Sequence, residues 1–280
     1  MTVTLLGATE IRSLAARLDV TPTKKLGQNF VVDANTVRRI VQVAKVADSD
    51  RVVEVGPGLG SLTLAILETG AAVTAVEIDS RLAAELPTTA AAHGVPDGAL
   101  TVVASDAMRV SELPGDPRVL IANLPYNVSV PVLLHLMETF ENLERGVVMV
   151  QSEVGERLAA APGSKVYGSP SAKAAWYGSW RTVGSVSRQV FWPVPNVDSV
   201  LVAFERSTTV RGTEDERHRT FQVIDAAFQQ RRKMLRQALS GIWGGSAAAS
   251  EILQRAGVAP TARGEALRID DFHRIALAAG

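Results

Sequence analysis

The sequence lacks cysteine altogether and contains only four histidines among its 280 residues. Without cysteine there can be no disulfide bond, no thiol nucleophile and no zinc site built on thiolates. The histidines are scattered along the chain without the spacing of metal ligands, so the sequence predicts no metal site. Metal-dependent and thiol-based redox chemistry are therefore not expected.

Long hydrophobic runs are also missing, because no stretch of about 18 or more uninterrupted apolar residues occurs. Residues 1–18 lack the basic start and long apolar run of a signal peptide. We therefore expect a cytoplasmic protein without membrane contact. Neither charge is in excess, since 29 Lys and Arg residues balance 29 Asp and Glu residues, so any attraction to nucleic acid must be local.

The composition, with 46% hydrophobic and 21% charged residues, excludes a disordered or fibrous chain. Short apolar runs alternate with helical patterns in the first half, a pattern typical of a parallel sheet with helices on both faces. The runs are residues 51–55, 72–77, 100–104, 119–122 and 146–150, with further strand candidates at 180–187 and 198–204. The sequence therefore predicts a Rossmann-like α/β core.

A change of pattern after residue 206 predicts a second, smaller domain. Residues 207–215 are polar without an apolar period, which is typical of a linker. Apolar residues then recur at helical spacing up to Leu239, and a further helix is predicted at 247–256. We expect a core domain over residues 1–206 and a small helical domain over residues 207–280.

A glycine-rich turn, Glu54-Val55-Gly56-Pro57-Gly58-Leu59-Gly60, follows the first strand of the predicted sheet. Glycines let the backbone approach a ligand closely at the strand end where open α/β sheets bind nucleotides. A nicotinamide dinucleotide is the alternative ligand, but its fingerprint is G-x-G-x-x-G. The spacing here is G-x-G-x-G, and the nearby Glu54 suits the cationic sulfonium and amine of S-adenosylmethionine better than a pyrophosphate.

Acidic residues end the next two predicted strands. Glu77 lies where a carboxylate can accept both ribose hydroxyls, a feature shared by dinucleotide and S-adenosylmethionine sites. Asp106 follows the third strand, where it could accept a hydrogen from an adenine amine. Either residue alone could be a simple cap, but their recurrence at successive strand ends favours a nucleoside cofactor.

The fourth predicted strand leads into Asn123-Leu124-Pro125-Tyr126, which can activate an exocyclic amine. Such an amine is a poor nucleophile because its lone pair is delocalised into the ring. If the Asn123 side-chain oxygen accepts one amine hydrogen and a backbone carbonyl, that of Pro125, accepts the other, the lone pair can turn towards a methyl donor. Tyr126 would stack on the base.

Taken together, these motifs resemble those of the ribosomal RNA adenine dimethyltransferases, in particular the bacterial enzymes that modify two adjacent adenines near the 3′ end of small-subunit rRNA. The resemblance rests on residues 25–30, 54–60, 123–126, 191–199 and 230–233. It implies a class I S-adenosylmethionine-dependent methyltransferase core. The implied partner is 16S rRNA, within an immature small subunit, and a monomeric enzyme is expected.

The resemblance also implies roles for individual residues. Phe191 would stack on the target base opposite Tyr126, completing a catalytic set of Asn123, Leu124, Pro125, Tyr126 and Phe191. The expected cofactor contacts are Gln28, Asn29, Val31, Glu54, Gly56, Gly58, Glu77, Ile78, Asp106, Ala107 and Asn123. The chain departs from the family at a leader of about 20 residues, longer than expected, in which Ile11, Leu14, Ala15 and Leu18 share one face of a predicted packing helix.

The expected RNA contacts are basic residues at two places in the chain. Residues 206–280 contain 12 Arg and Lys against 8 Asp and Glu, a balance of 12 − 8 = +4 in a neutral protein. The predicted contacts to phosphate are Lys24, Lys25, Arg231, Arg232, Lys233 and Arg236, the last four expected within two helical turns. A solvated basic face is the alternative interpretation of such a cluster.

Other functions stay open at this point. The same motifs would suit a large-subunit rRNA adenine methyltransferase or a DNA adenine methyltransferase. A non-catalytic nucleic-acid-binding factor on the same scaffold is a third alternative, although Asn123 and the acidic cofactor positions are intact. A dehydrogenase is the least favoured.

Overall fold

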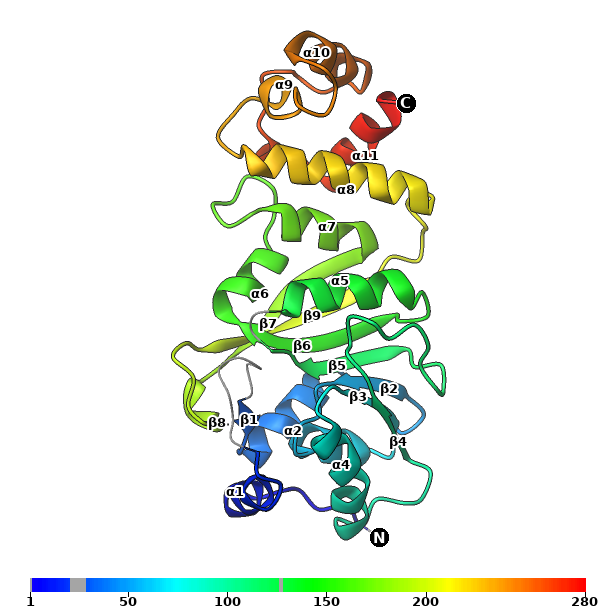
Figure 1. Cartoon of the computed structure of the whole chain (residues 1–280), viewed down its shortest axis with the longest axis vertical. Helices are drawn as coiled ribbons and strands as arrows, with labels where there is room; N and C mark the ends of the chain where they lie inside the picture. Colours follow the sequence, from blue (N-terminus) through cyan, green and yellow to red (C-terminus); the bar gives the residue numbers. More distant parts are fainter. Residues whose placement is uncertain (1, 21–28, 126–127) are drawn as a thin grey trace. The chain divides into compact units, whose positions relative to one another are not determined.

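The computed structural model describes residues 2–20, 29–125 and 128–280 (Figure 1). Contacts within the chain group it into two compact units. The first unit comprises Met1–Gly155 and Thr182–Arg206, and the second comprises Glu156–Arg181 and Ser207–Gly280. The units share the predicted boundary after residue 206, but residues 156–181 are grouped with the C-terminal helices. That residues 156–181 belong to the core domain therefore stays a prediction.

The core of the fold is a seven-stranded sheet with the strand order β4-β3-β2-β5-β6-β9-β7. Its strands are β2 (Arg51–Val55), β3 (Ala72–Glu77), β4 (Leu100–Ala104), β5 (Val119–Asn123), β6 (Arg145–Gln151), β7 (Gly178–Val186) and β9 (Ser199–Arg206). The strands from β2 to β6 pair in parallel, and β9 runs antiparallel to β6. The predicted α/β core is confirmed.

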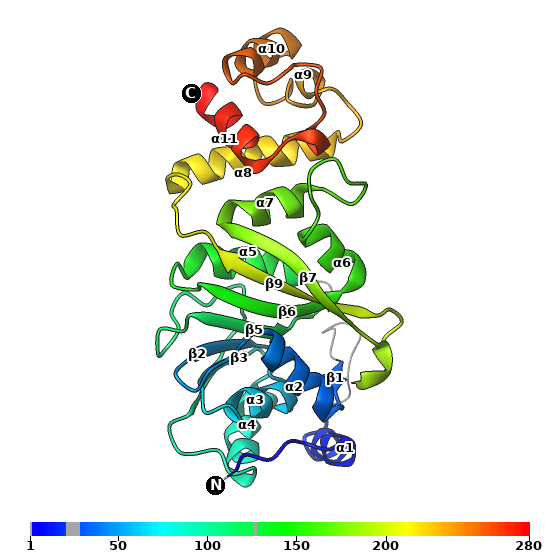
Figure 2. The same ribbon diagram turned by 180° about the vertical axis from the view of Figure 1, so that it is seen from behind.

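Helices cover both faces of this sheet, which explains why β5 is almost wholly apolar and why both β2 and β5 are largely buried. In Figure 2, α2 (Ala34–Val43) and α3 (Ser61–Leu67) lie on the face towards the viewer. In Figure 1, α5 (Ser129–Thr139) lies on the opposite face. Because β2 is flanked by β3 and β5, the strand order reverses there, and a crevice is expected at the carboxyl ends of these strands.

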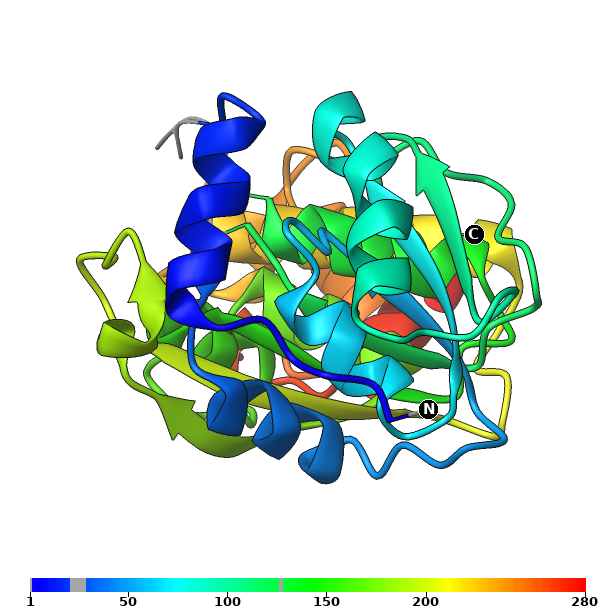
Figure 3. The same cartoon turned by 90° about the horizontal axis from the view of Figure 1, so that it is seen from below.

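The N-terminal leader forms α1 (Ala8–Arg17), the predicted packing helix, with Ile11 and Ala15 buried. Figure 3 shows α1 and α4 (Ser80–Ala92) at the same end of the first unit. After the leader, β1 (Phe30–Val31) pairs antiparallel with β8 (Phe191–Trp192). No sequence pattern predicts this pairing, because two-residue strands have no detectable period.

The second unit is helical. It contains α7 (Ser169–Tyr177), α8 (Glu214–Gln229), α9 (Leu235–Ala238), α10 (Ser246–Arg255) and α11 (Ile269–Ala278), while α6 (Ser152–Leu158) lies across the division. Helix α8 begins where the polar linker ends, because the Thr213 hydroxyl accepts the backbone N–H of Glu216 as a cap. Residues 156–181 join this unit because Trp176 packs on Phe221 and Tyr167 on Phe228.

The expectation that Arg231 to Arg236 continue one helix is wrong. Helix α8 ends at Gln229, residues 230–233 form a turn, and α9 begins at Leu235. After α8 the backbone N–H of Lys233 donates to the Gln230 carbonyl oxygen at 2.8 Å and that of Leu235 to the Ala262 carbonyl oxygen at 2.8 Å, so the hydrogen-bond pattern of α8 does not continue. Among the described residues, no helix is both long enough and apolar enough to cross a membrane.

The centre of the sheet yields a test of the packing. A Cβ atom at Gly146 on β6 would overlap the backbone carbonyl oxygen of Leu120 and the ring of Phe204. We expect Gly146→Ala to lower the free energy of unfolding by about 3 kcal/mol. This value is at the upper end of the usual range for an overpacked core, because the backbone must move. Gly7→Ala, whose Cβ would contact nothing, is the control. Equal urea midpoints for the two variants would contradict the packing described here.

Candidate active site

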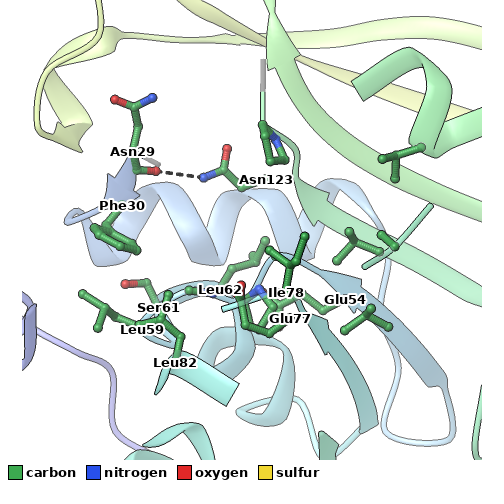
Figure 4. A pocket seen from close by; sticks show the side chains of 18 of the residues that line it. Asn29, Phe30, Glu54, Leu59, Ser61, Leu62, Glu77, Ile78, Leu82 and Asn123 are labelled. Atoms are coloured by element: carbon green, nitrogen blue, oxygen red, sulfur yellow. Dashed lines mark hydrogen bonds between the residues drawn. The ribbon is translucent and has the colours of Figure 1, made fainter. Parts of the chain in front are cut away.

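A pocket opens at the carboxyl ends of the central strands (Figure 4). It is lined by every expected cofactor residue that the structure describes, together with Pro125 of the reaction loop. These residues are Asn29, Val31, Glu54, Gly56, Gly58, Glu77, Ile78, Asp106, Ala107 and Asn123. Gln28, Tyr126, Lys24 and Lys25 lie outside the described residues. The structure thus brings together residues that come from five separate places in the sequence.

The turn after β2 needs its glycines for two reasons. Gly56, Gly58 and Gly60 have φ values of 70°, 58° and 99°, a region that side chains with a Cβ rarely adopt. At Gly58, a Cβ would also lie 2.9 Å from the Phe30 ring. The turn can therefore hold its backbone against the pocket only with glycine.

Glu77 is held at the end of β3 by two backbone groups. Its Oε2 accepts the N–H of Gly58 at 3.0 Å, and its Oε1 accepts the N–H of Asp79 at 2.9 Å. Burial raises the pKa of Glu77, and these two hydrogen bonds oppose the rise. Each carboxylate oxygen keeps lone pairs, so the side chain can accept hydroxyl hydrogens as expected for a ribose contact.

Glu54 is also buried, but its hydrogen bonding differs from that of Glu77. Its side chain is 1% exposed, and Oε2 has no hydrogen-bond partner among the described residues. Burial raises the pKa of Glu54 to about 8; the nearby Thr63 hydroxyl opposes the rise and the Glu77 charge adds to it. The Ser61 hydroxyl on the same pocket also lacks a partner within the described chain.

These unsatisfied groups fit the expected cofactor. A buried acceptor without a partner is unfavourable in the ligand-free chain and becomes favourable when a donor arrives. The amine of S-adenosylmethionine is a cationic donor, and its charge would stabilise the ionised form of Glu54. The pocket therefore offers the cofactor an acidic end at Glu54 and hydroxyl acceptors at Glu77.

Asn123 ends β5 at the mouth of the reaction loop. Its amide nitrogen donates to the backbone carbonyl oxygen of Asn29 at 3.1 Å (Figure 4). This bond sets the orientation of the amide, and within the described chain the Oδ1 atom accepts no hydrogen bond. Asn123 can therefore accept a hydrogen from an incoming amine.

The residues after Asn123 are anchored to the core. The Leu124 side chain is buried and its N–H donates to the carbonyl oxygen of Met149 at 3.1 Å. The Pro125 carbonyl oxygen accepts the N–H of Val128 at 3.3 Å, which leaves it one lone pair. Leu124 and Pro125 are thus held by backbone hydrogen bonds, and the identity of the second acceptor stays a prediction.

Asp106 and Ile78 occupy the remaining side of the pocket. One Asp106 oxygen accepts the N–H of Met108 at 2.9 Å, which leaves the other carboxylate oxygen for a ligand amine. Ile78 is 60% exposed although it is large and apolar, as expected of a residue that a flat ligand would cover. Both placements agree with an adenine at this side.

Phe191 does not line the pocket. Its ring is 2% exposed and belongs to the core cluster, and its backbone pairs with Val31 through the β1 and β8 strands. A stacking contact with a target base would require this ring to become uncovered. Its role in catalysis stays a prediction.

The predicted RNA contacts of the second unit differ in their ion pairing and in their exposure to solvent. The Arg231 guanidinium pairs with Glu265 at 3.1 Å and donates to the Lys165 carbonyl oxygen at 2.7 Å. Arg232 and Lys233 are exposed, and Arg236 is half-buried. Arg231 therefore has a structural role as well, and RNA binding by all four residues stays a prediction.

Several residues of the pocket wall were not predicted from the sequence. They include Phe30, Leu59, Ser61, Leu62, Leu82, Val128 and Val132. Apolar residues at helical or strand spacing are expected to be core, so nothing in the pattern separates these from ordinary packing residues. Leu59, which lies within the glycine turn, and Ser61, which directly follows it, could have been found from their positions.

Glu54 yields a pH test on the ligand-free chain. Folding raises its pKa from 4.5 to about 8, so the native state keeps a proton that the unfolded chain releases. Stability should therefore be complete below the unfolded pKa and fall as pH rises towards about 8, by roughly 1 kcal/mol per pH unit.

Glu54→Gln removes this titration. We expect the variant to gain stability over the wild type progressively between about pH 5 and pH 8 in urea denaturation, and to bind S-adenosylhomocysteine more weakly. A stability difference that does not change with pH would show that Glu54 is ionised in the native chain.

Comparison with known proteins gives the family. The sequence matches the family described as Ribosomal RNA adenine dimethylase over residues 21–279. A protein named Ribosomal RNA small subunit methyltransferase A from Leifsonia xyli subsp. xyli is 65% identical over 274 residues, covering 97% of this chain and 98% of that protein. The protein of the same name from Streptomyces coelicolor is 60% identical over 276 residues, covering 97% and 96%.

Two solved structures show the same fold. A dimethyladenosine transferase from Plasmodium falciparum has a TM-score of 0.74 at 24% identity, covering 87% of this chain and 94% of that one. The 23S rRNA methyltransferase ErmE has a TM-score of 0.65 at 23% identity, covering 89% and 99%. These likenesses confirm the methyltransferase fold expected from the sequence. Because the family match and both relatives span nearly the whole chain, this protein belongs to the ribosomal RNA adenine dimethylases.

Proposed function

We propose that this chain transfers methyl groups from S-adenosylmethionine to the exocyclic amines of two adjacent adenines in a hairpin loop near the 3′ end of 16S rRNA, giving dimethyladenosines. The observation that carries this proposal is the position of Asn123. Asn123 lines the same pocket as the cofactor residues Glu54 and Glu77, and its amide nitrogen donates to the Asn29 carbonyl oxygen. An amine acceptor beside a nucleoside pocket suits transfer to a nucleobase.

The residues of the loop activate the amine. When bound, S-adenosylmethionine supplies an electrophilic methyl group. Asn123 Oδ1 accepts one amine hydrogen and a loop carbonyl accepts the other, so the lone pair of the nitrogen turns towards that methyl group. The nitrogen–carbon bond forms as the sulfur–carbon bond breaks, and the amine loses a proton to water. A second round adds the second methyl group.

A neutral amide suits this position better than a carboxylate. The nitrogen carries positive charge before it loses its proton, and a carboxylate would hold that charge, or the sulfonium, in an ion pair. Asn123 accepts the hydrogen without such a pair. No general base is needed before the transfer.

The partner is rRNA, and we place the reaction on the immature small subunit in the cytoplasm, performed by a monomer. The relatives from Leifsonia xyli and Streptomyces coelicolor are both named as small-subunit methyltransferases, which favours this target over large-subunit rRNA. Exposed Arg232 and Lys233 are suited to contact phosphates.

The reaction is tested by a labelled-methyl assay. With small subunits or 16S rRNA that lack the modification, we expect two methyl groups on each of two adjacent adenines, located by sequencing the modified RNA. Asn123→Ala should lower kcat on the order of 100-fold, as loss of a transition-state hydrogen bond does elsewhere. Label in large-subunit rRNA would show that large-subunit rRNA, and not 16S rRNA, is the substrate. No transfer by the wild type, or full transfer by the variant, would refute it.

Asn123→Asp tests the orientation of the amide. An ionised carboxylate cannot donate to the Asn29 carbonyl oxygen, which Asn123 now approaches at 3.1 Å, and the two oxygens would repel. A protonated carboxyl can donate there and still accept an amine hydrogen with its other oxygen. We expect the variant's kcat relative to wild type to rise about tenfold for each pH unit lowered towards the pKa of the introduced group. If the kcat of the variant relative to wild type does not change with pH, the Asn29 contact has no part in the mechanism.

A further inference from the structure

The leader, residues 2–20, has no part in the proposed reaction, yet it packs beside the pocket. Its buried residues Val3, Leu6, Ile11, Ala15 and Val20 form one cluster with Phe30, Leu59, Leu64 and Leu82. Ile11 is 0% exposed at the centre of α1. The apolar face of the leader is therefore fully used within the first unit.

Three partners of the leader in this cluster also line the pocket. Phe30, Leu59 and Leu82 lie together along one side of it, across from Glu54 (Figure 4). Leu59 belongs to the glycine turn itself, and the Phe30 ring lies against Gly58. Each of these side chains thus packs with the leader and also borders the pocket.

A polar connection reaches the pocket by a second route. The carbonyl oxygen of Asp19, at the end of the leader, accepts from Arg81 at 2.8 Å. Arg81 pairs with the Asp79 carboxylate at 2.8 Å. The backbone N–H of Asp79 in turn donates to Glu77 Oε1 at 2.9 Å. This chain of contacts ends on the carboxylate that is expected to bind the ribose.

We propose that the leader is a positioning element of the cofactor pocket: α1 supports Phe30, Leu59 and Leu82 from outside, and Asp19 supports Glu77 through Arg81. The inference rests on the proposed function, because it takes S-adenosylmethionine as the ligand. The leader sets how tightly the cofactor binds. It leaves the methyl-transfer step unchanged, since Asn123 is held by Asn29 and not by the leader.

The first test truncates Ile11. Ile11→Ala removes three carbons from the cluster behind the pocket, and we expect S-adenosylhomocysteine to bind about fivefold more weakly or worse by titration calorimetry. The KM for S-adenosylmethionine should rise while kcat stays unchanged. The matched control is Ile275→Ala, an equally buried isoleucine (0% exposed) on a helix of the second unit. Both variants should lose stability, but only the first should lose affinity.

The second test breaks the polar route at an exposed side chain, so that folding is not at risk. Arg81→Met removes both the Asp19 and the Asp79 contacts, and we expect severalfold weaker binding of S-adenosylhomocysteine. The control is Arg17→Met, which removes a leader contact to Glu85 that does not lead to Glu77. This control should bind as the wild type does.

The outcomes separate the two levels of the proposal. If the wild type does not bind S-adenosylhomocysteine, the proposed function fails and the inference fails with it. If the wild type binds S-adenosylhomocysteine and both Ile11→Ala and Arg81→Met bind it as tightly as the wild type does, only the inference is overturned. It is overturned as well if Ile275→Ala weakens binding as much as Ile11→Ala, because the effect would then follow stability alone.

Discussion

The reversal of strand order at β2 is the constraint on which the whole site depends. β2 pairs in parallel with β3 on one side and with β5 on the other, so the segments that leave β2 and β5 run to opposite halves of the sheet. They leave a crevice between them at the carboxyl ends. The glycine turn borders it from β2 and the reaction loop borders it from β5. A methyl donor and a target amine can meet in this crevice because the segments that follow β2 and β5 lead away from each other.

Within this crevice, two buried carboxyl groups are prepared for different parts of one ligand. Backbone N–H groups of Gly58 and Asp79 hold Glu77, which fixes its oxygens where a ribose could reach them. Glu54 has an oxygen without a partner among the described residues, and burial raises its pKa to about 8. The first carboxyl is arranged by the protein alone. We propose that a cationic group of the cofactor completes the second, which would link the charge on the cofactor to the charge on the protein.

The reacting loop is likewise set by residues far away in the sequence. The amide of Asn123 takes its orientation from the carbonyl of Asn29, which directly precedes β1, and β1 pairs with β8. The same β1 segment carries Phe30, which packs against Gly58 and into the cluster of the leader. One short segment thus touches the glycine turn, the Asn123 amide and the cluster of the N-terminal helix.

The sequence by itself determined the chemistry, because residue type and order carry it: the glycine spacing, the acids at strand ends, and an asparagine before proline and tyrosine. It also determined the α/β core, because buried parallel strands are nearly continuous apolar runs. Only the tertiary structure decided the break after α8, the pairing of β1 with β8, the grouping of residues 156–181 with the C-terminal helices, and the wall of Phe30, Leu59 and Leu82. These features depend on contacts between residues distant in sequence, and an apolar side chain that lines a pocket has the same local pattern as one that fills a core.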